Sequence, residues 1–227
     1  YGMGVSETMI GNYIKSNGNP FVIATKASIS RDPETQERTF DNSSQHLETE
    51  LNKSLERLGV DYVDLFYIHR RDPRFPIEDV METLLKFKID GKIGGIGFSE
   101  ISPSSLRRAS EVGLVDAVQS EYSLWTRSAE LGLIQTCQEL GVSFIPFSPL
   151  GRGIFSKISP DPSTFGELDF RKNNPRFLQP NFSENLNLLA PFKQLCADLN
   201  VSPSTMAIAW TLNQGEHILP IPGTRSR

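Results

Sequence analysis

The segment Asp61–Arg71 limits the possible folds of this chain more than any other stretch. Residues 62–68 form an almost unbroken apolar run, rich in aromatic and β-branched side chains. Such a run is typical of a strand buried on both faces, as in a parallel sheet covered by helices. The run changes abruptly to the polar sequence His69-Arg-Arg-Asp72. Because α/β folds place their chemistry at the carboxyl ends of such strands, His69 is a candidate functional residue.

Strand-like and helix-like patterns alternate along the whole chain. Apolar runs typical of strands begin near residues 21, 62, 93, 116, 143 and 218. A helical stripe follows the first of them, made of Leu47, Leu51, Leu55 and Leu58, with Gly59 as the expected stop. The alternation predicts parallel strands joined by right-handed crossovers. Two polar stretches, 28–44 and 153–182, are expected to be irregular loops.

Two helices carry specific packing predictions. Ser6 is expected to cap a helix over about residues 7–17, whose inner face would hold Met9, Ile10, Tyr13 and Ile14. A second helix, over about residues 128–140, is expected to present Leu131, Ile134 and Cys137 on one face.

The polar strand ends favour a barrel over an open dinucleotide-binding sheet. An open sheet of that kind should show G-x-G-x-x-G after a strand, and the nearest candidate, Gly95-Ile-Gly97, fails because its sixth position is Glu100. In contrast, nearly every strand ends in a polar residue: Lys26, His69, Ser99, Glu121, Ser148, Arg225. A (β/α)₈ barrel gathers such residues at its C-terminal face. The chain is therefore predicted to be a single barrel domain over residues 1–227, with about six of the eight strands present.

Composition excludes several classes of function. The net charge is −4 and the pI about 5.5, with no basic run, so nucleic acid is not expected as a partner. No apolar run is long enough to span a membrane, and no His, Asp or Glu set has metal-ligand spacing. The two cysteines, Cys137 and Cys196, lie within helical patterns and are expected to be buried reduced thiols, which favours a reducing, cytoplasmic location.

The order of several short motifs resembles one known family. These motifs are Tyr1-Gly-x-Gly-x-Ser-Glu7, Ile23-Ala-Thr-Lys26, Asp64-Leu-Phe-Tyr-Ile-His69, Gly97-Phe-Ser99, Gln119-Ser-Glu-Tyr122, Phe147-Ser-Pro-Leu-Gly151 and Ile221-Pro-Gly-Thr224. Each motif alone is weak, but their joint order and spacing resemble the aldo-keto reductases over essentially the whole chain. The resemblance is strongest to the branch that includes pyridoxal reductases and perakine-reductase-like enzymes. It implies a (β/α)₈ barrel that reduces small carbonyl substrates with NADPH.

The resemblance also implies a catalytic set. By motif, Tyr1 matches the catalytic Tyr, Lys26 the Lys and His69 the His of the family tetrad. The tetrad Asp would lie about five residues before Tyr1, and the first two strands and the C-terminal tail of the family are also not matched. The chain is therefore expected to be an internal segment of a longer reductase. Without the resemblance, Tyr1 would be interpreted as a frayed end, Lys26 as a solvated charge and His69 as a structural histidine.

The remaining matches concern the cofactor and the substrate. Three residues match the positions that hold the nicotinamide carboxamide: Ser99, Glu100 and Gln119. Many members carry Asn where this chain has Glu100, and an ionised carboxylate can accept a hydrogen bond but cannot donate one. Phe147 matches the aromatic residue that stacks on the nicotinamide. Trp125 is expected to line the substrate pocket.

Two further sets match the phosphate groups of NADPH. The loop that closes over the pyrophosphate is matched by Ser148, Pro149, Leu150, Gly151 and Arg152, and the 2′-phosphate site by Gly223, Thr224 and Arg225. Arg152 alone would equally suit a helix cap or a pair with an acidic residue. A different class of protein shares the motifs, namely the non-catalytic, NADPH-binding β-subunits of potassium channels. Turnover of carbonyl compounds and stable association with a channel would distinguish the two.

Overall fold

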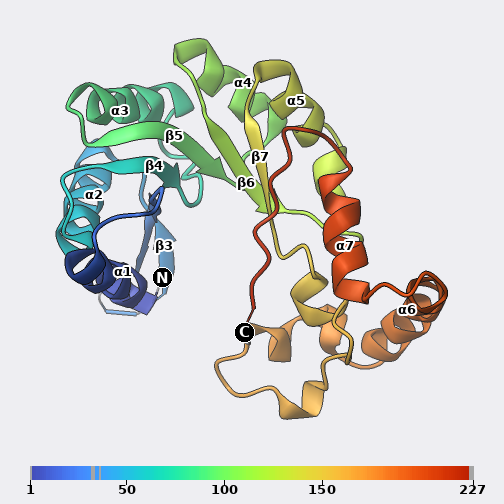
Figure 1. Ribbon diagram of the computed structural model, residues 1–227. Helices are drawn as coiled ribbons and strands as arrows, with labels where there is room; N and C mark the ends of the chain where they lie inside the picture. Colours follow the sequence, from blue (N-terminus) through green and yellow to red (C-terminus); the bar gives the residue numbers. More distant parts are fainter. Residues whose placement is uncertain (1, 32–33, 36, 225–227) are drawn as a thin grey trace. The chain divides into compact units, whose positions relative to one another are not determined.

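The computed structural model describes residues 2–31, 34–35 and 37–224 (Figure 1). Its main sheet has five strands in the order β1-β4-β5-β6-β7 and is not closed. These strands are β1 (Ala24–Ala27), β4 (Val63–Ile68), β5 (Ile93–Ser99), β6 (Ala117–Glu121) and β7 (Ser143–Phe147). The pairings β1–β4, β4–β5 and β5–β6 are parallel, as the alternation predicted.

Seven α-helices are present in the described part of the chain. They are α1 (Val5–Asn17), α2 (Ser44–Leu58), α3 (Ile77–Ile89), α4 (Pro103–Val112), α5 (Leu133–Leu140), α6 (Asn181–Asp198) and α7 (Pro203–Leu212). None of them is both long and apolar enough to cross a membrane.

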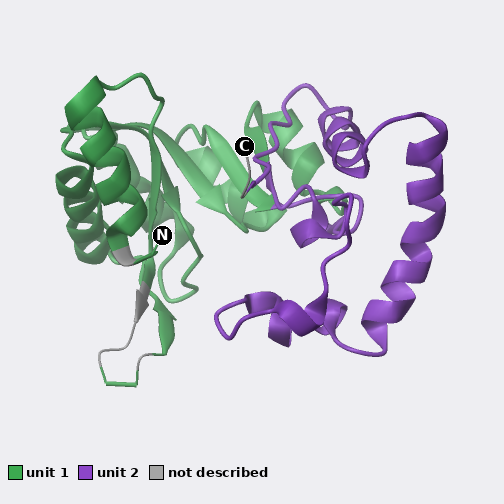
Figure 2. Ribbon diagram, turned by 60° about the horizontal axis from the view of Figure 1, so that its bottom comes forward, with its two compact units in different colours: residues 1–120, 129–145 green, residues 121–128, 146–227 purple. Residues whose placement is uncertain are grey.

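The chain separates into two compact units (Figure 2). Unit 1 comprises residues 1–120 and 129–145, with most of the sheet and helices α1 to α5. Unit 2 comprises residues 121–128 and 146–227, with helices α6 and α7. A single domain over the whole chain stays a prediction.

Helix α2 confirms the predicted leucine stripe. All four leucines, from Leu47 to Leu58, are buried in unit 1. The Ser43 side chain accepts a hydrogen bond from the His46 N–H, and Gly59 ends the helix in the left-handed conformation at φ 67°. The prediction succeeds here because the leucines whose spacing indicates a helix are also the side chains that the helix buries.

Helix α1 corrects the predicted helix start and packing face. The residue before the helix is Gly4 rather than Ser6, and Met9 is 68% exposed and Tyr13 48% exposed. The inward residues are Glu7, which accepts a hydrogen bond from Arg57 Nε at 2.6 Å, and Gly11. A Cβ at Gly11 would lie 2.3 Å from the Arg57 carbonyl oxygen, so only glycine allows this approach of α1 to α2. An ion pair and a close backbone contact, rather than apolar periodicity, orient the helix.

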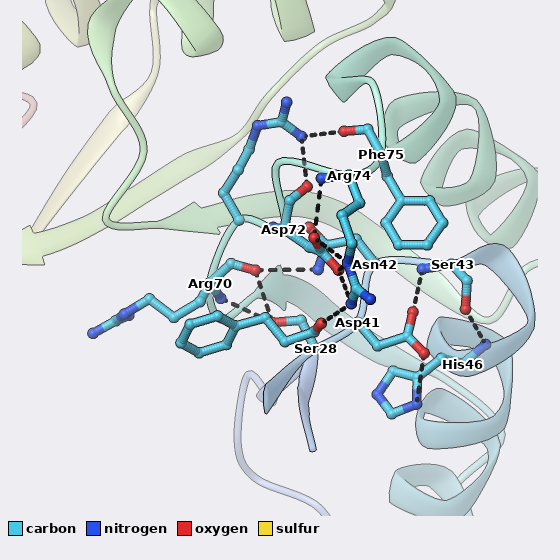
Figure 3. A network of polar contacts seen from close by, with 11 residues as sticks. Ser28, Asp41, Asn42, Ser43, His46, Arg70, Asp72, Arg74 and Phe75 are labelled. Carbon is cyan, nitrogen blue, oxygen red and sulfur yellow. Dashed lines mark hydrogen bonds and ion pairs between the residues drawn. The ribbon is translucent and has the colours of Figure 1, made fainter. Parts of the chain in front are cut away.

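The predicted loop 28–44 contains a β-hairpin. Strand β2 (Ile29–Arg31) pairs antiparallel with β3 (Arg38–Phe40), and Ile29 lies opposite Phe40. The segment is fixed to the loop after β4: Asn42 Nδ2 donates to the Arg70 carbonyl oxygen at 3.1 Å, and Asn42 Oδ1 accepts from the Asp72 N–H at 2.8 Å (Figure 3). The prediction of an irregular loop was wrong because polar side chains, rather than an apolar face, hold this hairpin.

Two further predictions are corrected. The helix expected over 128–140 is a 3₁₀ turn (Ser128–Glu130) followed by α5, and Leu131 between them is 87% exposed. The strand expected from residue 218 is reduced to isolated bridge residues, Ile218 and Ile221. Ile221 pairs with Phe147, and its N–H donates to the Pro146 carbonyl oxygen at 3.0 Å. Pro220 and Pro222 flank Ile221 and carry no backbone N–H.

Unit 2 has its own apolar core. The segment 153–182, expected to be an irregular loop, contains short 3₁₀ turns before α6 begins at Asn181, and it contributes much of this core. The core residues are Ile154, Phe155, Phe165, Phe177, Phe182, Leu189 and Ala207. The segment is therefore packed through its aromatic side chains although it lacks long elements.

Candidate active site

The register of the parallel strands brings several predicted site residues onto one face of unit 1. Lys26 pairs with Tyr67, and Tyr67 pairs with Gly97. Side chains two residues apart on a strand lie on the same face of the sheet. The next row of this face, two residues further along, therefore holds His69, Ser99 and Gln119. Lys26 was predicted to stand at the end of its strand, and it is the last residue but one of β1. It therefore sits one row before His69, directed to the same side of the sheet.

Lys26 contacts side chains from two other strands, β4 and β6. Its Nζ donates a hydrogen bond to Gln119 Oε1 and lies 5.1 Å from the centre of the Tyr67 ring. Burial, together with the nearby Arg70 guanidinium, lowers the pKa of Lys26 to about 8. The side chain is therefore mainly a charged ammonium at neutral pH, with a pKa close to the pH at which enzymes work.

His69 follows β4 directly, and its N–H donates to the Ala27 carbonyl oxygen at 2.7 Å. Burial and the positive charges of Lys26 and Arg70 lower the pKa of His69 to about 4. The imidazole is therefore neutral between pH 5 and 8. A neutral imidazole can donate one ring N–H to a carbonyl oxygen without itself carrying a charge.

Tyr67 is a residue that the sequence reasoning missed. Its side chain is 3% exposed, and its ring occupies the space that a side chain at position 97 would need. A Cβ at Gly97 would lie 2.4 Å from Tyr67 Cδ1. Burial raises the pKa of Tyr67 to about 12, although a hydrogen bond with Gln119 acts in the opposite direction. The signal was present in the sequence, because Tyr67 precedes His69 by one strand repeat.

Ser99 and Glu100 lie at the end of β5. Ser99 is buried and its Oγ accepts a hydrogen bond from Arg70 Nη1 at 3.0 Å. Glu100 is exposed, adopts a left-handed backbone at φ 56°, and its N–H donates to the Gln119 carbonyl oxygen at 2.9 Å. Arg70 is a second residue that was not selected from the sequence, although it follows His69 directly.

Unit 2 contains the predicted pyrophosphate loop. Phe147 ends β7, and the loop from Ser148 to Arg152 contains left-handed residues at Ser148, Gly151 and Arg152. Arg152 Nη2 donates to Glu121 Oε2 at 2.6 Å, and its guanidinium lies 4.5 Å from the Phe170 ring. Of the alternatives that the sequence left open for Arg152, the structure shows the ion pair with an acidic residue. A phosphate ligand would have to compete with Glu121 for this guanidinium.

The other predicted residues of unit 2 lie in two places. Gly223 and Thr224 are exposed and follow the bridge at Ile221. Trp125 packs edge-on against Phe177, with ring centres 5.8 Å apart, and lines an apolar cavity of about 250 Å³. The other residues that line this cavity are Leu124, Phe155, Asn185, Leu188, Leu189 and Phe192. Tyr1 and Arg225 lie outside the described residues.

Comparisons with known proteins agree on one family. A model described as "Aldo/keto reductase family" matches residues 1–227. The chain is 40% identical to a Schizosaccharomyces pombe aldo-keto reductase, yakc, whose name specifies NADP(+), over 99% of the chain and 68% of that protein. It is 37% identical to "Probable aldo-keto reductase 1" of Glycine max, over 99% of the chain and 64% of that protein.

A solved structure shows the same fold. The glycerol dehydrogenase from Gluconobacter oxydans is 28% identical and superposes with a TM-score of 0.89, over 99% of this chain and 69% of that one. The chain thus spans about two thirds of the length of the relatives that it matches.

Proposed function

This chain belongs to the aldo/keto reductase family, and we propose that the protein is an NADPH-dependent reductase of small aldehydes or ketones. The observation that carries this proposal is the shared sheet face that presents Lys26, His69, Ser99 and Gln119 at the carboxyl end of parallel strands. The yakc relative, named as an NADP(+) enzyme, supports the choice of cofactor. The two buried free thiols, Cys137 and Cys196, agree with a cytoplasmic location.

The proposed mechanism divides hydride and proton between two sources. NADPH, when bound, supplies the hydride for the carbonyl carbon. The carbonyl oxygen takes its proton from the Tyr1 hydroxyl. The Lys26 ammonium is proposed to stabilise the negative charge of the phenolate that remains. The neutral His69 ring donates a hydrogen bond to the carbonyl oxygen, which stabilises the negative charge that develops there.

The donor and acceptor groups at the end of β5 fit the amide of a nicotinamide. Ser99 carries a hydroxyl that can donate to the amide oxygen, and Glu100 carries a carboxylate that can accept from the amide nitrogen. Gln119, proposed from the sequence as a third contact, is already hydrogen-bonded through Oε1 to Lys26, and its side chain also hydrogen-bonds to Tyr67. Phe147 is proposed to stack on the ring.

The phosphate and substrate sites are proposed for unit 2. The loop from Ser148 to Arg152 would bind the pyrophosphate, and Gly223, Thr224 and Arg225 the 2′-phosphate. The cavity beside Trp125 has an apolar lining that suits the carbon skeleton of a small carbonyl compound. Among the residues that the structure describes, no specific contact favours a function as a channel β-subunit.

The test measures carbonyl-dependent NADPH oxidation by the full-length protein on a broad panel of aldehydes and ketones. We expect Tyr1→Phe, Lys26→Met and His69→Gln each to lower kcat by about 10²–10⁴-fold, since each removes a group that handles the proton or the charge. NADPH binding, followed by fluorescence, should persist in all three. Lys53→Met, at an exposed lysine of α2, serves as the control and should leave kcat unchanged.

Two results would count against the proposal. NADPH binding without turnover of any compound on the panel would support the regulatory alternative, and stable capture by a channel would then be measured. Full activity of Lys26→Met or His69→Gln would show that the reaction does not take place at the shared sheet face.

A further inference from the structure

The main chain of Arg70 is fixed by the hairpin segment. Its N–H donates to Ser28 Oγ at 2.9 Å, and its carbonyl oxygen accepts from Ser28 Oγ at 3.0 Å and from Asn42 Nδ2 at 3.1 Å (Figure 3). Ser28 and Asn42 are buried. Buried side chains that bond to both polar groups of one residue leave its backbone little freedom. Arg70 is therefore held in place although it lies beyond the end of β4.

The side chain of Arg70 connects the ends of two strands. Its Nη1 donates to the His69 carbonyl oxygen at 2.6 Å and to Ser99 Oγ at 3.0 Å. A guanidinium has donors only, so in this contact the serine oxygen must accept. The Ser99 proton must consequently point away from Arg70. Because Ser99 is only 3% exposed, water offers this hydroxyl few alternative partners.

We infer that Arg70 is a positioning residue that fixes the Ser99 hydroxyl as a donor toward the amide oxygen of the nicotinamide, an inference that rests on the proposed function. Glu100 then accepts from the amide nitrogen. This division of roles accounts for a carboxylate at position 100, where an asparagine side chain could both donate and accept. The Ser99 hydroxyl supplies the donor, and its hydrogen bond from Arg70 keeps the hydroxyl proton directed at the amide oxygen.

The test compares the binding of two cofactors by the full-length protein, measured through fluorescence. We expect Arg70→Met to weaken NADPH binding by about 3- to 10-fold, the cost of one misdirected hydrogen bond. The thionicotinamide analogue of NADPH carries sulfur, a weaker acceptor, in place of the amide oxygen. Its affinity should fall by less than about 2-fold, because little hydrogen bonding to that atom is lost. Arg107→Met, at an exposed arginine of α4, is the matched control and should change neither affinity.

A double variant separates positioning from general damage. Ser99→Ala combined with Arg70→Met should bind NADPH no more weakly than Ser99→Ala alone, since Arg70 acts through that hydroxyl. Equal losses for the two cofactors, or losses that multiply in the double variant, would overturn the inference. Failure of the wild-type protein to bind NADPH would instead overturn the proposed function, so the two failures are distinguishable.

Discussion

At position 69, the surroundings of the side chain decide which form of histidine is present. Burial and two neighbouring cations favour the neutral ring, which lowers its pKa to about 4. Lys26 lies on β1, and Arg70, although it follows His69 directly in the chain, has its side chain held by Ser99 of β5. The sequence identified His69 as a candidate, but its protonation state depends on these contacts.

This low pKa predicts how stability depends on acid. The ordinary pKa of histidine is 6.5, so between pH 6.5 and 4 the unfolded chain binds more protons at this residue than the folded chain does. Stability from the neutral ring is fully present above pH 6.5 and is lost as the pH falls toward 4. We expect His69 to lower the free energy of unfolding of the wild type by about 2 kcal/mol over that pH window, after allowance for solvent screening. This pH-dependent decrease should be missing in His69→Gln. Urea unfolding at several pH values measures the difference, and parallel curves for wild type and variant would contradict it.

The pair of Tyr67 and Gly97 shows what residue-by-residue reasoning cannot supply. The sequence alone placed Gly95 and Gly97 only in a nucleotide-binding motif that fails at its sixth position. In the structure Gly97 leaves room for the Tyr67 ring, which in turn supports Lys26. The reason for the glycine lies on another strand, 30 positions earlier in the chain, and strand register determines the match.

At the scale of elements, the β2–β3 hairpin depends on polar contacts that its local sequence does not predict. Helix α2 was predictable because a leucine stripe and two caps occur within one short segment. The hairpin has no comparable apolar pattern, and its position is set by Asn42 and Ser28 through the Arg70 carbonyl oxygen. Such contacts join residues about thirty to forty positions apart, so they cannot be predicted from a local sequence pattern.

Removal of the Asn42 amide should therefore loosen the hairpin. Asn42→Ala deletes the donor to the Arg70 carbonyl oxygen and the acceptor of the Asp72 N–H, and leaves both groups buried without that partner. We expect a loss of about 2–4 kcal/mol in the free energy of unfolding. Amide hydrogen exchange in residues 37–44 should become faster. Thr39→Ala, at an exposed position of β3, is the control, and equal effects of the two variants would disprove this role of Asn42.

At the scale of the whole molecule, the sheet has an edge at β1. Among the described residues β1 pairs only with β4, and no strand follows β7 in the sheet, although Ile221 forms an isolated bridge with Phe147. The predicted barrel is therefore an open sheet in this chain, although the fold class is that of the family. An unpaired strand edge offers N–H and C=O groups to another chain.

This edge leads to a prediction about the 227-residue segment expressed alone. We expect its mass in light scattering to rise above 25.4 kDa as concentration increases, because β1 edges pair between copies. Ala24→Lys places a charge at an exposed position of β1 and should reduce the association. Ala190→Lys, at an exposed position of α6, should not. A constant mass of 25.4 kDa at all concentrations would show that the edge is protected in solution.

The sequence by itself determined the alternation of the main-sheet strands with helices, and the family, because hydrophobic periodicity and short motifs are local. The tertiary structure decided which side chains meet: Lys26 with Gln119, Tyr67 over Gly97, Arg70 with Ser99, and Arg152 with Glu121. Each of these contacts joins segments that are far apart in the chain. Strand register and loop packing bring them together, and both arise only when the strands have found their neighbours.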